Sequence, residues 1–298
     1  MRSPGYLPAM LLLALLPAAQ AAIELPFTQL ETGHVIIPVT LDGVTTPFVL
    51  DTGASATVVL PATWDAAGHD SEHGMVVGGK GAGGSVQGVR LIKLPTLGIG
   101  GQDVKVGYAV VMDVAAVAPV EGGAPQFGGI LGVDVLQHYV VELDFGAHVL
   151  KLYGPDEAAP VAKAWTPTRR LRGGLMGIDL KLAGATIPAV LDLGATGTIL
   201  NTAAAALPGV TKVDDCGSRA FGADEHELTL DCVTVEDLAV QSRDFGATAL
   251  SVADLPIFQT MRLATKHGKP SPAAIFGVDL LGQDVLILDA AGKRFGWR

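Results

Sequence analysis

One short pattern occurs twice in this chain of 298 residues and limits the possible folds more than any other feature. The pattern reads Val-Leu-Asp-x-Gly-Ala and then Ser or Thr, and it places Asp51 and Asp192 at the ends of two apolar segments, 141 residues apart. A lone carboxylate is costly to bury at the end of an apolar segment, so such a residue usually has a partner or a functional role. The two aspartates are therefore candidates to be each other's partner.

The similarity between the two halves extends beyond these motifs. Residues 43–51 align with residues 184–192 without a gap, and residues 130–136 align with residues 275–281 after four extra residues in the second half. A repeat of about 120–140 residues indicates two similar domains, because solenoid repeats are much shorter.

Domain bounds follow from this repeat and from a segment rich in proline and charge between the halves. Such a composition is typical of connections between domains. We expect a signal peptide at 1–21, a first lobe at 22–155, a linker at 156–170 and a second lobe at 171–298.

Short apolar or alternating segments, separated by glycine-rich turns, run through both halves. Glycine contributes 38 of the 298 residues, above the usual ~7%, and no long amphipathic helical pattern is present. This pattern predicts an all-β fold, a barrel or a sandwich, with a glycine-rich hairpin at 75–92. In the first half, strands are expected at 35–41, 47–50, 57–60, 91–97, 104–112, 129–133, 139–143 and 149–153, and a short helix at 61–67.

The N-terminus has the pattern of a secretory signal. Arg2 precedes an apolar core at 9–16, and Ala19-Gln20-Ala21 forms a small-x-small cleavage site. An uncleaved membrane anchor is the alternative, but the apolar run is shorter than the ~20 residues that a span needs. We expect an exported protein, periplasmic or secreted, without stable membrane insertion after cleavage.

The composition excludes some classes of protein. Hydrophobic residues make up 49% and charged residues 17%, which is enough apolar material for a folded core. The formal net charge is −10, so nucleic acid is not an expected partner.

The chain contains only two cysteines, Cys216 and Cys232. Two cysteines close together in an exported protein suggest a disulfide. The repeat places them on the arms of a second hairpin, below a tip centred at Asp224. A zinc site would need more ligands at metal-binding spacing, and we expect neither a metal nor another cofactor.

Two carboxylates held close together cannot both ionise easily, so the pKa of one rises and the pair holds one shared proton. The ionised member can take a proton from a water molecule, and the protonated member can polarise a carbonyl group. Such a pair can hydrolyse an amide without a metal. Gly53 and Gly194 allow backbone amides to approach the carboxylates, and Ser55 and Thr196 add a hydroxyl beside each turn.

Four other aspartates also recur at equivalent positions in the two halves. Asp134 and Asp279 each follow an apolar-apolar-Gly-Val sequence, and Asp144 and Asp289 each end an apolar segment. Asp134 and Asp279 are alternative members of the site, but we expect all four to serve in turns or caps, where the short carboxylate bonds to nearby backbone.

The chain resembles the aspartic proteases of the retropepsin and pepsin type. The resemblance rests on two sequence motifs and their repeats: Asp51-Thr52-Gly53-Ala54-Ser55 with Ile130-Leu131-Gly132, and Asp192-Leu193-Gly194-Ala195-Thr196 with Ile275-Phe276-Gly277. It implies two β-barrel lobes related by a pseudo-two-fold axis, with an active-site cleft between them.

The resemblance also implies roles for individual residues. Asp51 and Asp192 would form the catalytic dyad, and Thr52 would make a hydrogen bond between the lobes beneath it. Gly132 and Gly277 would support the two aspartate turns. The tip of a flap that covers the substrate would contain Gly79, Gly81, Gly83 and Gly84.

Two features depart from the family pattern. Leu193 stands where the family normally has threonine, and leucine cannot form the reciprocal hydroxyl hydrogen bond. The first hairpin also carries no tyrosine, which flaps of the pepsin type usually have.

The hypothesis from the sequence is an exported aspartic endopeptidase. It would be a monomer that cleaves peptide or protein substrates, with activity favoured at acidic pH. Two alternatives remain: a catalytically inactive peptide-binding protein of the cell envelope, suggested by Leu193, and a homodimeric protease that uses Asp51 only.

Overall fold

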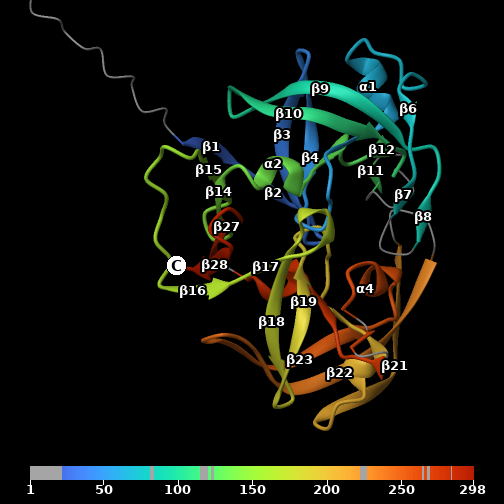
Figure 1. Ribbon diagram of the computed structural model, residues 1–298, viewed down its shortest axis with the longest axis vertical. Coiled ribbons are helices and arrows are strands. Elements are labelled where there is room, and N and C mark those ends of the chain that lie inside the picture. The colour runs from blue at the N-terminus through green and yellow to red at the C-terminus, as the bar shows by residue number, and fades with distance from the viewer. Residues whose placement is uncertain are drawn as a thin grey trace, which may run out of the picture.

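A computed structural model describes most of the chain (Figure 1). The described residues are 22–80, 84–114, 120–121, 124–221, 227–263, 265–266, 269–282 and 284–298. The predicted signal peptide at 1–21, Gly81 and Gly83 of the predicted flap tip, and Asp224 lie outside them.

The first lobe is a closed barrel of six strands, drawn in blue to green in the upper part of Figure 1. In the order in which they pair, its strands are β3 (Val35–Leu41), β4 (Val44–Leu50), β13 (Gly129–Leu131), β5 (Val58–Val59), β10 (Gln102–Val111) and β9 (Arg90–Ile99). The barrel closes because β9 pairs with β3 as well as with β10. Two short strands, β2 (Thr28–Gln29) and β6 (Met75–Val76), pair with β3 and β9.

The second lobe repeats this barrel in yellow to red below the first. Its strands, in the same order, are β18 (Met176–Leu182), β19 (Ala185–Leu191), β26 (Ala274–Phe276), β20 (Ile199–Leu200), β23 (Arg243–Val252) and β22 (Glu227–Val240). It closes through the pairing of β22 with β18. Outside the ring, β17 (Arg169–Arg170) pairs with β18 and β21 (Val210–Phe221) pairs with β22.

A third sheet joins the lobes, at the left of Figure 1. Its six strands pair in the order β1 (Ile23–Pro26), β15 (Val149–Tyr153), β14 (Val140–Asp144), β27 (Val285–Asp289), β28 (Arg294–Trp297) and β16 (Ala164–Pro167). The antiparallel pair of β14 with β27 connects one half of the chain to the other. This sheet therefore fixes the two barrels relative to each other.

The helices are short, and small hairpins complete the structure. The helical segments are α1 (Pro61–Ala66), α2 (Val133–Leu136), α3 (Thr202–Ala205), α4 (Pro256–Thr260), and the 3-10 turns η1 (Arg172–Gly174) and η2 (Val278–Leu280). The hairpins pair β7 (Gly79–Lys80) with β8 (Ser85–Val86), β11 (Val120–Glu121) with β12 (Ala124–Pro125), and β24 (Thr265–Lys266) with β25 (Lys269–Pro270).

One apolar core runs through both lobes. It forms because successive side chains of a strand point to opposite faces, so that Val35, Ile37 and Val39 of β3 are all buried. Among its largest fully buried side chains are Phe48, from the first lobe, and Phe276, from the second lobe. Burying a side chain of this size contributes about 1.5–3 kcal/mol, so the core is the main source of stability.

The structure confirms the predicted fold class, all-β with two related barrel lobes. It also confirms the short helix expected at 61–67. For the strand predicted at 129–133, the predicted C-terminal end is wrong. Strand β13 stops at Leu131 because the backbone N–H of Leu136 bonds to the carbonyl of Gly132 and closes a helical turn, α2.

The predicted domain bounds remain a prediction. The segment expected to be a linker, 156–170, contributes strands β16 and β17. The lead-in at 22–33 contributes β1 and β2.

Cys216 and Cys232 form the expected disulfide, with Cα atoms 6.0 Å apart. The pairing of β21 with β22 is interrupted by a bulge between Val213 and Ser218, and Cys216 lies in that bulge. The bond therefore joins the two strands of the second hairpin.

Among the described residues, no helix has both the length and the apolar character that a bilayer crossing requires.

Replacing both cysteines by alanine should destabilise the protein. The bond closes a stretch of 16 residues, and the chain-entropy model gives a loss of about 3 kcal/mol for a loop of this size. Urea unfolding of the oxidised protein and of the Cys216→Ala/Cys232→Ala variant measures the difference. Equal midpoints and slopes would contradict the expected contribution.

Candidate active site

The two aspartates of the repeated motif are held in the same way at the end of equivalent strands. Asp51 follows β4 and Asp192 follows β19. The backbone N–H of Asp51 bonds to the carbonyl of Leu131 at 3.1 Å, and that of Asp192 bonds to the carbonyl of Phe276 at 3.0 Å. Parallel pairing of β13 with β4 and of β26 with β19 brings these acceptors into place.

Each aspartate lies against the glycine of the opposite turn. A β-carbon added to Gly53 would lie 2.4 Å from the carboxyl carbon of Asp192. A β-carbon on Gly194 would lie 2.4 Å from the carboxyl carbon of Asp51. Contacts this short are not possible for a real β-carbon, so glycine is required at both positions. The fold thus brings together the two candidate residues that the sequence places 141 positions apart.

Backbone amides bind both carboxylates. The N–H groups of Gly53 and Ala54 donate to Oδ1 of Asp51 at 2.6 and 3.0 Å. The N–H of Gly194 donates to Oδ1 of Asp192 at 2.9 Å. These bonds orient each carboxylate within its own turn.

The two carboxyl groups also interact directly and titrate as a pair. Burial raises the pKa of Asp51 above its usual value, while the backbone bonds from Gly53 and Ala54 and the side-chain hydrogen bond with Asp192 oppose the rise. Burial raises the pKa of Asp192 well above its usual value, and the charge of Asp51 raises it further. The pair therefore holds one proton over a range of pH in which isolated aspartates are ionised.

The strands with the apolar-apolar-Gly sequence lie directly beneath the aspartate turns. A β-carbon on Gly132 would lie 2.7 Å from the carbonyl of Ala56, and one on Gly277 would lie 2.7 Å from the carbonyl of Ala195. The adjacent N–H groups of Val133 and Val278 bond to carbonyls in these turns at 2.9 and 3.0 Å. Both glycines thus allow a strand to support an aspartate turn at close range.

Asp134 and Asp279 fasten the far end of each turn. Asp134 accepts hydrogen bonds from the N–H and the hydroxyl of Thr57, both at 2.9 Å. Asp279 accepts the same pair of bonds from Thr198, at 2.9 and 2.8 Å. These contacts agree with the structural roles expected from the sequence.

Asp144 and Asp289 also bond to nearby backbone. Asp144 accepts from the N–H of Ala147 at 2.8 Å, and Asp289 accepts from the N–H of Gly292 at 2.7 Å. Both therefore act in turns, as expected.

Thr52 connects the two lobes beneath the dyad. Its hydroxyl donates to the carbonyl of Leu191 at 2.8 Å and accepts from the N–H of Leu193 at 3.0 Å. The side chain is 1% exposed. Both bonds are therefore shielded from water.

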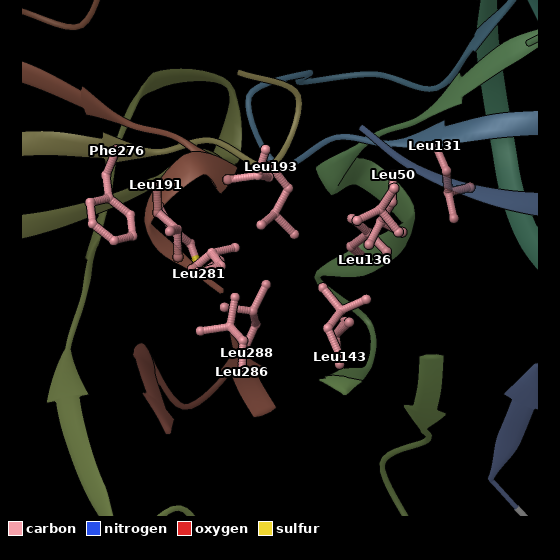
Figure 2. Packing of buried hydrophobic residues seen from close by; sticks show 14 of the residues in the cluster. Leu50, Leu131, Leu136, Leu143, Leu191, Leu193, Phe276, Leu281, Leu286 and Leu288 are labelled. Carbon is pink, nitrogen blue, oxygen red and sulfur yellow. The ribbon is translucent and has the colours of Figure 1, made fainter. Parts of the chain in front are cut away.

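Leu193 fills the position that mirrors Thr52. It is fully buried and belongs to the apolar core shared by the lobes. Figure 2 shows its side chain between Leu191 and Leu281 on one side and Leu50 and Leu136 on the other. At this position the chain therefore has an apolar contact between the lobes in place of a second hydroxyl bridge.

The two hydroxyl residues at the rims of the turns are exposed. Ser55 lies against the first residues of the second lobe, since a β-carbon added to Gly173 would be 2.8 Å from the β-carbon of Ser55. Thr196 is exposed at the equivalent place. The bonds to Oδ1 of Asp51 come from backbone N–H groups.

The expected hairpin at 75–92 is present. Strand β6 pairs with β9, and β7 pairs with β8 through Gly79 opposite Val86. In Figure 1 this hairpin projects from the first lobe in the direction of the second. Gly79 and Gly84 lie in its described part, while Gly81 and Gly83 lie outside.

Sequence reasoning missed one residue beside the dyad, His34. Its imidazole is close enough to Asp51 for their charges to interact, and it lies beside the backbone of Gly194. A single histidine before a strand carries no local signal. Comparison of the two halves would have singled it out, because Leu175 occupies the equivalent position.

Within the described parts of the chain, no three potential metal ligands of the His, Cys, Asp or Glu type gather at one place.

Comparison with known proteins gives one family. The sequence model of the aspartyl proteases matches residues 37–135, which include the first aspartate turn and its supporting strand. The resemblance seen in the sequence motifs is thereby confirmed. No curated protein matches the chain.

Replacing Thr52 by valine should weaken the contact between the lobes. Valine has the shape of threonine but lacks the hydroxyl, so the carbonyl of Leu191 and the N–H of Leu193 lose their buried partner. We expect a loss of about 2–4 kcal/mol, because an unpaired buried polar group costs ~1–3 kcal/mol. Urea unfolding measures the change.

Thr52→Ser is the matched control, since serine keeps the hydroxyl. It should retain most of the stability. Equal stability of the valine variant and the natural protein would show that these bonds do not hold the lobes together.

Replacing Asp192 by asparagine should stabilise the protein at neutral pH. A pKa raised on folding contributes stability that is present at low pH and is lost as the pH rises through the folded-state value. The natural protein therefore loses stability towards pH 7, at ~1.4 kcal/mol for each unit by which the pKa is raised. Asparagine cannot ionise and avoids this loss.

Thermal unfolding of both proteins at pH 3 and pH 7 tests this expectation. The difference should be large at pH 7 and small at pH 3. A variant that is less stable at both values would contradict the raised pKa.

Proposed function

We propose that this protein is an exported aspartic endopeptidase in which Asp51 and Asp192 activate a water molecule. The match of its first lobe to the aspartyl protease family supports this proposal. The observation that carries the proposal is the close approach of each aspartate to the glycine of the opposite turn. Because two carboxylates this close repel each other when both are ionised, the pair is expected to share one proton.

The chemistry follows from unequal surroundings. The charge of Asp51 raises the pKa of Asp192, while the charge of His34 lowers that of Asp51, so Asp51 is assigned as the base and Asp192 as the proton carrier. Asp51 would take a proton from water as the oxygen attacks the peptide carbonyl, and Asp192 would give its proton to the carbonyl oxygen. In the second step the nitrogen leaves with the proton from Asp51, and Asp192 recovers its proton as the new carboxyl group forms.

Extended peptides are the substrate class that suits this arrangement. A peptide strand can bond through its main chain to strands or hairpins beside it, while its side chains enter pockets on alternate sides. The first hairpin, with Gly79 and Gly84 in its described part, and the disulfide-linked second hairpin are the candidate elements for such contacts.

Export is part of the proposal. The N-terminal pattern at 1–21 is typical of a cleaved signal peptide. The disulfide between Cys216 and Cys232 suits an oxidising compartment such as the periplasm or the exterior.

The geometry favours a dyad formed within one chain over the homodimeric alternative, since both aspartates lie in one pair of lobes. The inactive alternative was suggested by Leu193. That residue fills an apolar contact between the lobes, and this role is compatible with a working dyad.

Purified mature protein should cleave a mixed peptide library at acidic pH, and Asp51→Asn or Asp192→Asn should each lower kcat/KM by at least about 10²–10⁴-fold, the usual range for general acid–base catalysis. Activity should fall at low pH as Asp51 becomes protonated. It should also fall as the pH rises through the raised pKa of Asp192.

Asp144→Asn is the matched control, because Asp144 bonds to a turn N–H that asparagine can also satisfy. It should cleave normally. Loss of activity in Asp51→Asn alone would favour the homodimer, and no cleavage by a folded, mature protein would favour the inactive peptide-binding protein.

A further inference from the structure

His34 lies in a tight turn just before strand β3. The N–H of Leu30 bonds to the carbonyl of His34 at 3.0 Å, and the hydroxyl of Thr32 lies 2.8 Å from Nδ1 of its ring. The side chain is half-buried. The turn therefore fixes both the backbone and one edge of the imidazole.

This turn of the first lobe lies against the second lobe. A β-carbon on Gly33 would be 2.9 Å from a methyl group of Val278, and Gly33 has φ +91°, a backbone conformation that suits glycine. The ring of His34 lies beside the backbone of Gly194, the glycine that lies against Asp51. The imidazole thus lies close to one aspartate turn and near the carboxylate of the other.

The carboxylate of Asp51 is the charge that acts on the ring, and Asp51 titrates together with Asp192. Asp279, next to Val278 in the second lobe, is occupied by its two bonds to Thr198. On its own turn, Glu31 is exposed.

The equivalent position of the second lobe has no ionisable group. Leu175 lies 141 residues after His34, is 1% exposed and packs in an apolar cluster. The repeat is symmetrical in its backbone, so a histidine on one side makes the surroundings of the two aspartates unequal.

We propose that His34 is a positioning residue of the dyad: when protonated, it stays between the two aspartate turns and its charge keeps Asp51 ionised, so that cleavage continues to lower pH. This inference rests on the proposed protease function. It adds a cation to the acidic dyad, on one side only, and names Asp51 as the base.

The sign of the effect follows from the surroundings of the ring. Burial lowers the pKa of His34, while the charge of Asp51 and the nearby backbone of Gly194 act to raise it. The ring is therefore neutral at neutral pH and becomes charged on acidification, which is where the dyad is expected to work. A cation near Asp51 lowers the pKa for the first ionisation of the pair, so the acid limit of activity lies lower than it would without the histidine.

The direct test is an NMR titration of the histidine ring in the natural protein and in Asp51→Asn. Loss of the carboxylate charge should lower the pKa of His34, because the charged ring loses its partner. An unchanged pKa in the variant would overturn the proposal. This readout does not require activity, so it decides the matter even if the protein cleaves no peptide and the proposed function fails.

The kinetic test compares pH profiles of kcat/KM for three variants. His34→Leu copies the residue at the equivalent position of the second lobe and should shift the acid limb upward by about one pH unit, the lower end of the usual effect of an opposite charge near a carboxylate. His34→Arg carries a permanent charge and a planar donor, and it should restore the natural acid limb.

His138→Leu is the control, since His138 is exposed at the end of α2. Its profile should match that of the natural protein. An acid limb that does not move in His34→Leu, or a uniform loss of activity at every pH in both His34 variants, would overturn the proposal and leave His34 a purely structural role.

Discussion

Two carboxylates that must share a proton are the constraint on which the rest of this structure depends. Each lies where the opposite turn has glycine, and no larger residue fits there. The strands, turns and glycines of both lobes bring these carboxylates together and bury part of their surface. Burial and mutual repulsion then raise the pKa of the pair, which is what an acid–base pair active at low pH requires.

The contact between the lobes beneath the dyad is built differently on its two sides. Thr52 bridges the lobes with two buried hydrogen bonds, while Leu193 enters the leucine-rich core that Figure 2 shows. Hydrogen bonds fix direction, and apolar packing supplies affinity between surfaces. One polar bridge sets the register of the turns, and the leucine adds buried area around it. His34 adds a second difference between the sides, so a symmetrical backbone carries an unequal site.

Much of this arrangement could be predicted from the sequence because it is repeated. Two copies of the aspartate motif at a fixed spacing predicted two related lobes, and the register of the copies placed the disulfide on the second hairpin. What could not be predicted depends on partners that are distant in the chain. Strands β1 and β16 pair with β15 and β28, so the short segments that form them give no strong local signal. Leu193 was expected to weaken the site, and its place in a core shared by both halves became visible only in three dimensions.

The number of protons held by the two aspartates tests this account most directly. Aspartate labelled with ¹³C at the side-chain carboxyl, followed by NMR from acid to neutral pH, reports the ionisation of Asp51 and Asp192 separately from the other aspartates. The account predicts two coupled steps, with the last proton leaving at a pH well above the usual range of aspartate. Two independent steps, both within the usual range, would show that the carboxylates do not share a proton and would contradict the central claim.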